Sequence, residues 1–167
     1  RHADSRFEPF GERMSALSTR MLFSADEFRR RAEREQAPHA DFDYGDHSLN
    51  PDLRDLILGN SLRDAAVMIA AVDRAEGASI ILTKRTEKLR SHSGQIAFPG
   101  GRIDATDPTP EFAAIRETEE EIGIGAETIE IIGRMPDYVS GSGYRIAPIL
   151  GVAKPGFSLS LNADEVD

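Results

Sequence analysis

The feature that most limits the possible folds is one long helical segment, at residues 109–123, between two groups of short apolar runs. The helix has a clear beginning and end: Thr109 can cap its first turn, Pro110 suits its first position, and Gly123 ends it. The apolar runs on both sides have the length of strands and lie at residues 65–72, 79–83, 128–135, 144–152 and 157–161. Strands around one central helix predict a mixed α/β domain.

Residues 1–63 are predicted to form a polar arm and a helical extension, and residues 64–167 the main domain. Ser24 and Glu27 fit a capping box, so we expect a helix to begin there. Asn50 and Pro51 predict the start of a second, short helix, and a polar loop over residues 38–48 joins the two.

Composition excludes several classes of function. The chain has no Cys, which rules out disulfides, thiolate nucleophiles and Cys-based metal sites and fits a reducing cytoplasm. Its apolar runs are too short to cross a bilayer, and it shows no signal peptide, so we expect a soluble, cytoplasmic protein without membrane contact. The net charge of -9 argues against nucleic acid as a partner.

Positive charge is nevertheless concentrated in the segment from Lys84 to Arg102. Five basic residues stand there against the single acid Glu87, namely Lys84, Arg85, Lys88, Arg90 and Arg102. This local excess predicts a small anionic molecule as the partner.

The central helix carries three glutamates that share one face. Glu117, Glu120 and Glu121 are three and four residues apart, so their carboxylates converge and call for a cation. Hard oxygen ligands select Mg²⁺, Mn²⁺ or Ca²⁺, and Arg116 is placed to orient Glu120. The alternative is an ordinary solvated acidic face. The context favours a metal site: a Phe-Pro-Gly-Gly turn precedes the helix, and its apolar residues Phe112, Ala113 and Ile115 supply a packing face.

Residues 116–124 resemble the second half of the Nudix box, in which Arg-Glu is followed by Glu-Glu and Gly. Thr118 stands at a place that is usually apolar. The first half departs from the box, because Gly101 is too far from Arg116 and Pro108 replaces an expected Glu. The longer acidic loop over residues 104–107 is instead similar to the coenzyme A pyrophosphatase branch.

A second signature of that branch lies upstream. Its matching positions are Leu82, Thr83, Lys84, Arg85, Arg90, Gly94 and residues 98–101, with mild deviations at Ile81 and Thr86. The resemblance implies an α/β/α sandwich with a mixed sheet, and hydrolysis of coenzyme A or its thioesters to 3′,5′-ADP and 4′-phosphopantetheine products. Other nucleoside diphosphate derivatives, such as ADP-ribose, NADH or an oxidised nucleotide, and a non-catalytic nucleotide sensor remain alternatives.

The resemblance also assigns roles. Glu117, Glu120 and Glu121 would bind Mg²⁺ or Mn²⁺ and, with Arg116, form the catalytic set. Phosphate ligands are expected among Arg85, Arg90, His92 and Arg102, with Gly100 and Gly101 in the turn below the helix. His92 is equally explained by loop packing, and the glycines by the turn alone.

Two points stay open at this stage. The proton acceptor is one of the helix glutamates or a loop carboxylate such as Glu165, for which we favour an ordinary surface position. A Nudix domain normally has a further strand and helix after the region near Glu165, and these cover the sheet. Either the chain is truncated or the N-terminal helices cover part of the sheet instead. The sequence gives no prediction of the oligomeric state.

Overall fold

The computed structural model describes residues 23–35, 44–50, 61–87 and 94–167, together with residues 52, 55 and 59. At its centre two ten-residue strands, β2 (Arg63–Val72) and β9 (Tyr144–Ala153), pair in parallel along their whole length. Both strands begin with exposed or partly exposed residues, contain both buried and partly exposed residues in the middle, and end in a continuous run of buried ones. This pattern is expected of strands that are covered on both faces.

Shorter strands complete a seven-stranded mixed sheet. On one side, β9 pairs antiparallel with β7 (Ile129–Arg134) and β8 (Tyr138–Val139), and β8 pairs in parallel with β1 (Tyr44–Gly45). On the other side, β2 pairs antiparallel with β3 (Ser79–Ile80) and β6 (Gly100–Arg102). A separate two-stranded sheet joins β4 (Thr83–Lys84) to β5 (Ile96–Ala97).

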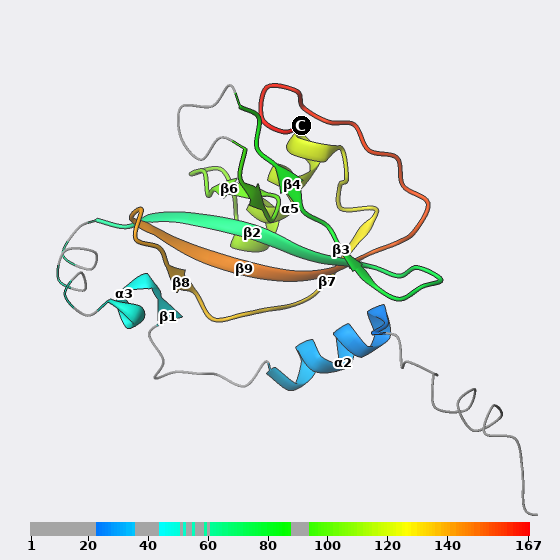
Figure 1. Ribbon diagram of the computed structural model, residues 1–167, viewed down its shortest axis with the longest axis horizontal. Coiled ribbons are helices and arrows are strands. Elements are labelled where there is room, and N and C mark those ends of the chain that lie inside the picture. The colour runs from blue at the N-terminus through cyan, green and yellow to red at the C-terminus, as the bar shows by residue number, and fades with distance from the viewer. Residues whose placement is uncertain are drawn as a thin grey trace, which may run out of the picture.

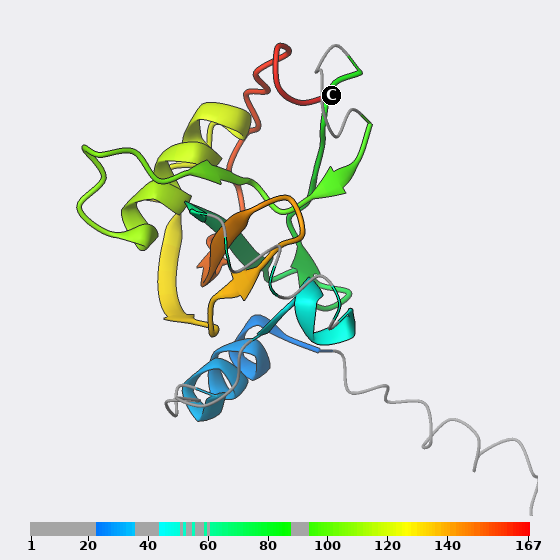
Figure 2. The ribbon, with the colours of Figure 1, turned by 90° about the vertical axis from the view of Figure 1, so that its left-hand side faces the viewer.

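Helices cover both faces of the main sheet (Figures 1 and 2). Helix α5 (Pro110–Ile122) packs on β2 and β6, and α2 (Ala25–Glu35) lies across the opposite face, against β7. A third, short helix, α3 (Asp46–Leu49), follows β1. The predicted mixed α/β sandwich is therefore confirmed. None of the helices in the described part of the chain is long and apolar enough to cross a membrane.

Small side chains let α5 approach the sheet closely. Ala113 and Ala114 of the helix and Ala66 and Ala70 of β2 are fully buried in one core cluster. Phe112, expected on the packing face, is instead 51% exposed. The buried face of the helix begins one residue later because Phe112 lies in the first turn, beside the cap.

Both ends of α5 form as the sequence predicts. The Thr109 hydroxyl accepts a hydrogen bond from the Phe112 N–H at 3.2 Å. Gly123 adopts the left-handed conformation with φ 75°, and its N–H donates to the Glu119 carbonyl at 2.9 Å. Within the helix, the hydroxyl of the fully buried Thr118 donates to the Ala114 carbonyl at 2.6 Å. A threonine is tolerated at this apolar place because its polar group is satisfied inside the helix.

The N-terminal predictions are confirmed in part. The Ser24 hydroxyl accepts from the Glu27 N–H at 3.1 Å, so α2 begins where the capping box predicts. The expected loop at residues 38–48 was wrong over its last part, where β1 and the start of α3 form because β8 supplies a pairing edge. Apart from residues 52 and 55, the helix predicted after Asn50 lies outside the described residues.

The structure differs from two further strand predictions and from the predicted glycine turn. The predicted strand at 79–83 is divided between β3 and β4, which belong to different sheets. The glycine turn contains strand β6, since Gly100 and Gly101 pair with β2. Residues 157–161, all of them described, form no strand.

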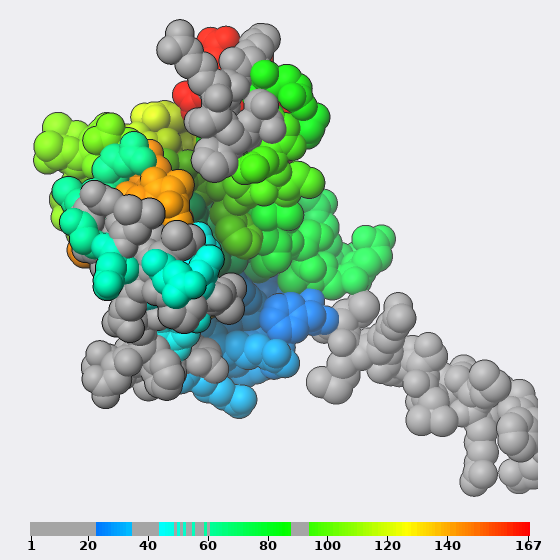
Figure 3. All heavy atoms as spheres, turned by 60° about the vertical axis from the view of Figure 1, so that its left-hand side comes forward, coloured from blue at the N-terminus to red at the C-terminus, as the bar shows by residue number. Residues whose placement is uncertain are grey.

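The C-terminal residues join α5 to the small sheet instead. The Ser160 N–H donates to the Ile122 carbonyl, and the Asp167 N–H donates to the Lys84 carbonyl, both at 2.9 Å. Val166 is buried and bridges antiparallel to Arg85. In the space-filling view, the C-terminal atoms, in red, lie beside the green segment that contains β4 (Figure 3).

Gly123 and Gly143, two of the glycines with positive φ, offer a matched test of the contact between α5 and this segment. Gly123→Ala and Gly143→Ala both place a methyl group at positive φ, which costs about 1–2 kcal/mol. At Gly123 the methyl carbon would also stand 2.8 Å from Ser160 Cβ, whereas around Gly143 the described atoms leave it free space. We expect urea unfolding to show an additional loss of about 1 kcal/mol for Gly123→Ala. Equal losses would contradict this account.

Candidate active site

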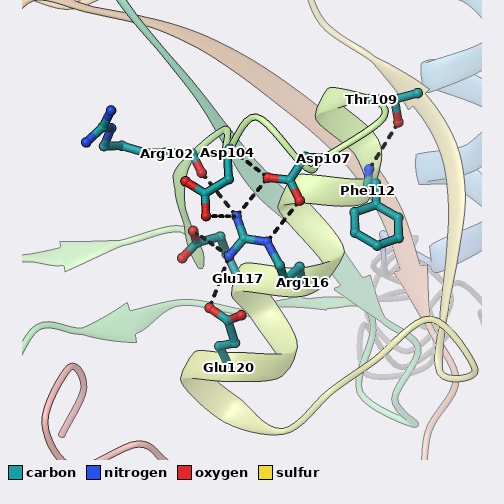
Figure 4. A network of polar contacts seen from close by, with 8 residues as sticks. All are labelled: Arg102, Asp104, Asp107, Thr109, Phe112, Arg116, Glu117 and Glu120. Atoms are coloured by element: carbon teal, nitrogen blue, oxygen red, sulfur yellow. Dashed lines mark hydrogen bonds and ion pairs between the residues drawn. The ribbon is translucent and has the colours of Figure 1, made fainter.

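Arg116 is the centre of a polar network on α5 (Figure 4). Its guanidinium donates twice to Asp107, from Nε to Oδ1 at 3.0 Å and from Nη2 to Oδ2 at 2.9 Å. Nη1 lies 3.0 Å from Glu117 Oε1 and 3.1 Å from Glu120 Oε2. The Arg102 carbonyl accepts from Nη2 at 3.1 Å. One cation therefore joins the helix to the loop before it and to the end of β6.

Asp107 is held by its own loop. Its carboxylate also accepts from the Asp104 N–H at 2.8 Å, and its N–H returns a bond to the Asp104 carbonyl at 3.0 Å. Its side chain is only 1% exposed. Hydrogen bonds from Arg116 lower the pKa of Asp107, and the same contact raises the pKa of Arg116, so both groups stay charged.

The three helix glutamates do not share one environment. Glu121 is 3% exposed and Glu117 is partly buried. The side chain of Glu120, in contrast, is 53% exposed and forms an ion pair with Arg116. Across the described residues, no group of three His, Asp or Glu side chains is arranged to hold a metal ion. The face predicted from the spacing exists, but only Glu117 and Glu121 turn inward.

Glu121 is the most perturbed carboxylate of the site. Burial, and after it the negative charges of Glu165 and Glu117, raise the pKa of Glu121 to about 7, against the lowering effects of Arg85 and the Gly100 N–H. Its Oε2 is buried and has no hydrogen-bond partner within the described structure. Burial also raises the pKa of Glu117, against the lowering effect of Arg116. Buried carboxylates with an unsatisfied oxygen are suited to a positively charged ligand.

Gly100 and Gly101 explain how these carboxylates come so close to the sheet. A Cβ on Gly101 would stand 2.5 Å from Glu117 Oε2, and one on Gly100 would stand 2.7 Å from Val67 Cα. The glycines therefore have a steric role, and binding of substrate by their backbone stays a prediction.

The predicted phosphate ligands have different positions. Arg85 is partly buried, and its Nε is enclosed without a partner in the described part of the chain. The Arg102 side chain points away from the Arg116 network into solvent (Figure 4). Arg90 and His92 lie outside the described residues.

Glu165 was a loop candidate for the proton acceptor, but an ordinary surface position was favoured for it. It is partly buried, and its charge raises the pKa of both Glu117 and Glu121. It lies more than 40 residues beyond them in the chain and outside the motif, so only the folded C-terminal segment reveals the proximity.

A pocket of about 450 Å³ lies away from these charges, between α2 and the opposite face of the sheet. Aromatic and aliphatic side chains dominate its lining, which among the described residues includes no carboxylate. The site on α5, not this pocket, therefore has the chemistry that the sequence predicts.

Comparison with protein families agrees with this arrangement of strands, helix and glutamates. The family model described as the NUDIX domain matches residues 62–160, more than half of the chain. The chain belongs to the Nudix family.

Similar proteins carry the same family name. This chain is 40% identical over 116 residues to a protein of Citrobacter koseri named uncharacterized Nudix hydrolase NudL, covering 68% of this chain and 60% of that protein. An Escherichia coli protein of the same name is 43% identical over 104 residues, which cover 62% of this chain and 54% of that protein. This chain thus aligns with little more than half the length of these relatives.

Solved structures agree on the fold. The Nudix hydrolase RenU of M. smegmatis matches 63% of this chain and 67% of its own, with a TM-score of 0.54 and 22% identity. A C. elegans Ap4A hydrolase in a binary complex matches 64% of this chain and 77% of its own, with a TM-score of 0.52 and 20% identity. At these identities the similarity concerns the fold of the Nudix domain alone.

The donors of this Nudix domain fit a hard divalent cation. Mg²⁺ is commonly held by one or two carboxylates together with substrate phosphates and water. Glu117 and Glu121 supply two inward carboxylates, one of them with an unpaired buried oxygen. The third predicted ligand, Glu120, is held by Arg116 in this arrangement.

Asp107→Asn tests the network around Arg116. We expect the variant to lose about 1–3 kcal/mol of unfolding free energy at neutral pH. The reason is that the side chain of residue 107 loses its negative charge, which weakens the two hydrogen bonds that it accepts from Arg116. Asp104→Asn is the control, since Asp104 is mostly exposed and its carboxylate lies 3.9 Å from Arg116.

The pH dependence gives a second measurement. The pKa of Asp107 is lowered in the folded state, so its stabilising effect is complete above the ordinary aspartate pKa of about 3.9 and is lost as the pH falls below it. Chemical denaturation at several pH values should therefore show the difference between wild type and Asp107→Asn shrinking in acid. A constant difference would exclude the ion pair as its cause.

Proposed function

We propose that this chain is the catalytic part of a Mg²⁺- or Mn²⁺-dependent hydrolase that cleaves the diphosphate of coenzyme A or its thioesters to 3′,5′-ADP and 4′-phosphopantetheine products. The family name of its relatives supports a hydrolase. Because the chain covers only 54–60% of those relatives, the activity is proposed for the whole protein. Its place of action is proposed to be the cytoplasm, in keeping with the absence of Cys.

The observation that carries the proposal is the buried carboxylate of Glu121 with an unpaired oxygen next to Glu117. Two inward carboxylates with raised pKa values are unfavourable without a cation. A bound divalent cation would neutralise the diphosphate oxygens and activate water for attack. In this proposal Glu117, Glu120 and Glu121 would hold that cation. Arg116 would keep the helix and the loop before it in place through its contacts with Glu120 and Asp107.

The chain's own cations are proposed to bind the substrate phosphates. Arg85 is the best supported of them, since it attracts Glu121 and its Nε has no partner in the described structure. A guanidinium with a free N–H suits a phosphate oxygen. Arg90, His92 and Arg102 belong to the same proposal from the sequence alone.

The choice of coenzyme A depends on the two branch signatures. They include residues 82–85, which contain β4, and residues 98–101, which follow β5 and contain the start of β6. Coenzyme A carries a 3′-phosphate besides its diphosphate, so a preference for it requires additional positive charge. The basic segment from Lys84 to Arg102 supplies that charge in an otherwise acidic chain.

A substrate panel tests the proposal directly. Purified protein is incubated with coenzyme A, dephospho-coenzyme A, ADP-ribose or NADH, with Mg²⁺, Mn²⁺ or EDTA, and the products are separated by mass. We expect 3′,5′-ADP from coenzyme A, slower cleavage of the other compounds and no reaction in EDTA. Cleavage of the other diphosphates alone would overturn the substrate, and tight nucleotide binding without turnover would indicate a sensor.

Glu121→Gln tests the role of the buried carboxylate in the same assay. We expect kcat/KM to fall at least about 100-fold, equivalent to about 2.7 kcal/mol of transition-state stabilisation. The matched control is Glu119→Gln, because Glu119 belongs to the same motif but is exposed. Similar rates for wild type and Glu121→Gln would exclude Glu121 from the metal site.

A further inference from the structure

The pocket between α2 and the sheet has the size of a small-molecule site. Its volume of about 450 Å³ lies within the range of roughly 300–1,000 Å³ that such sites have. Helix α2 forms one wall, and β7, β8 and β9 form the other, on the face of the sheet opposite α5 (Figure 2). There is therefore room for one small molecule between two layers of the fold.

Aromatic side chains line this pocket from both walls. On the α2 side, the rings of Phe23 and Phe28 lie edge to face with their centroids 6.4 Å apart. On the other side stand Tyr44 of β1 and Tyr138 of β8. Phe23, Tyr44 and Tyr138 are each more than a third exposed, at 41%, 39% and 36%, so these rings are not covered by the folded chain. Exposed rings gathered around one pocket favour a ligand with an aromatic body.

Two arginines bring positive charge to this apolar pocket. The Arg31 guanidinium lies over the Phe23 ring, 5.1 Å from its centroid, and its Nε donates to Glu27 at 2.8 Å. Arg134 forms an ion pair with Asp137 through Nη2. Each guanidinium has further N–H groups beyond these contacts. Neither Glu27 nor Asp137 lines the pocket, so the cations border it and their carboxylate partners do not.

This distribution of charge selects the kind of ligand. The chain has a net charge of -9, yet among the described residues the pocket lining contains two cations and no carboxylate. A neutral molecule or an apolar peptide would gain nothing from these cations, whereas an anionic group can accept hydrogen bonds from a guanidinium. The lining offers few groups that could read the polar edges of a nucleobase. The ligand therefore differs from the substrate proposed above.

We propose that this pocket binds a small organic anion whose aromatic body lies between α2 and the strands and whose carboxylate, sulfonate or phosphate group accepts hydrogen bonds from Arg31. Arg134 is the second cation of the site. Arg31 is prepared for this role because the Phe23 ring and Glu27 already hold its guanidinium in place. The site lies on the opposite face of the sheet from α5 and does not depend on the proposed function.

Two fluorescent probes with the same ring system test the role of charge. The sulfonate probe is 8-anilinonaphthalene-1-sulfonate, and the neutral probe, N-phenyl-1-naphthylamine, lacks the sulfonate. Each is titrated into wild type, Arg31→Gln and the matched control Arg30→Gln. Arg30 precedes Arg31 on α2, is also exposed and also pairs with Glu27, but it does not line the pocket.

We expect wild type to bind both probes saturably and the sulfonate probe more tightly. Arg31→Gln should raise the dissociation constant of the sulfonate probe about 5- to 10-fold and leave that of the neutral probe unchanged. Arg30→Gln should change neither. Both arginines are exposed, so we expect both variants to fold, and thermal unfolding checks this.

A third variant tests the location. Ala32 is buried on α2 and lines the pocket, so the larger side chain of Ala32→Leu would occupy part of the space and should weaken both probes. Normal binding of both probes by folded Ala32→Leu would overturn the inference.

Other outcomes would also overturn it. These are equal effects of the two arginine variants, an equal loss of both probes in Arg31→Gln, and no saturable binding by wild type. Loss of probe binding as the protein dimerises would show that a second copy covers the pocket. Competition between the sulfonate probe and 3′,5′-ADP would assign the pocket to the nucleotide substrate instead.

Discussion

The structure depends on the close approach of one glycine-containing strand to its neighbours. Strand β6 pairs with β2 and packs against α5, and there is no room for a side chain at Gly100 or Gly101. This approach brings the Glu117 carboxylate against the backbone of the sheet and so removes it from water. Once the helix is held there, its inward glutamates become buried charges, and the chemistry of the site follows from that burial.

Arg116 makes this concentration of acid compatible with folding. It faces Asp107 on the loop and Glu117 and Glu120 on the helix, so a single guanidinium compensates several carboxylates. Glu121 has no such partner among the described residues at its Oε2. The network therefore separates structural acids, which are paired, from one acid that is left for a ligand.

The central helix and the long strands could be predicted because their signals are local. Thr109, Gly123 and the apolar runs of β2 and β9 specify elements through capping and periodicity. The short strands were missed or misplaced because each exists only through a partner: β1 needs β8, and β6 needs β2. The same holds for the site. The spacing of Glu117 and Glu121 was informative, whereas the partly buried position of Glu165 depends on contacts with distant segments. Glu120 is held by Arg116, four residues before it on the same helix, as the spacing predicted.

The parallel pairing of β2 with β9 also has a consequence for how the chain folds. Each paired residue is joined to a partner 81 positions later, as in Arg63 and Tyr144. Loop closure over that distance is slow, whereas α5 and its capped ends can form locally. During synthesis, β2 can therefore pair with β9 only after almost the whole domain has left the ribosome. We expect its apolar edge to be the part of the nascent chain most exposed to aggregation until β9 arrives.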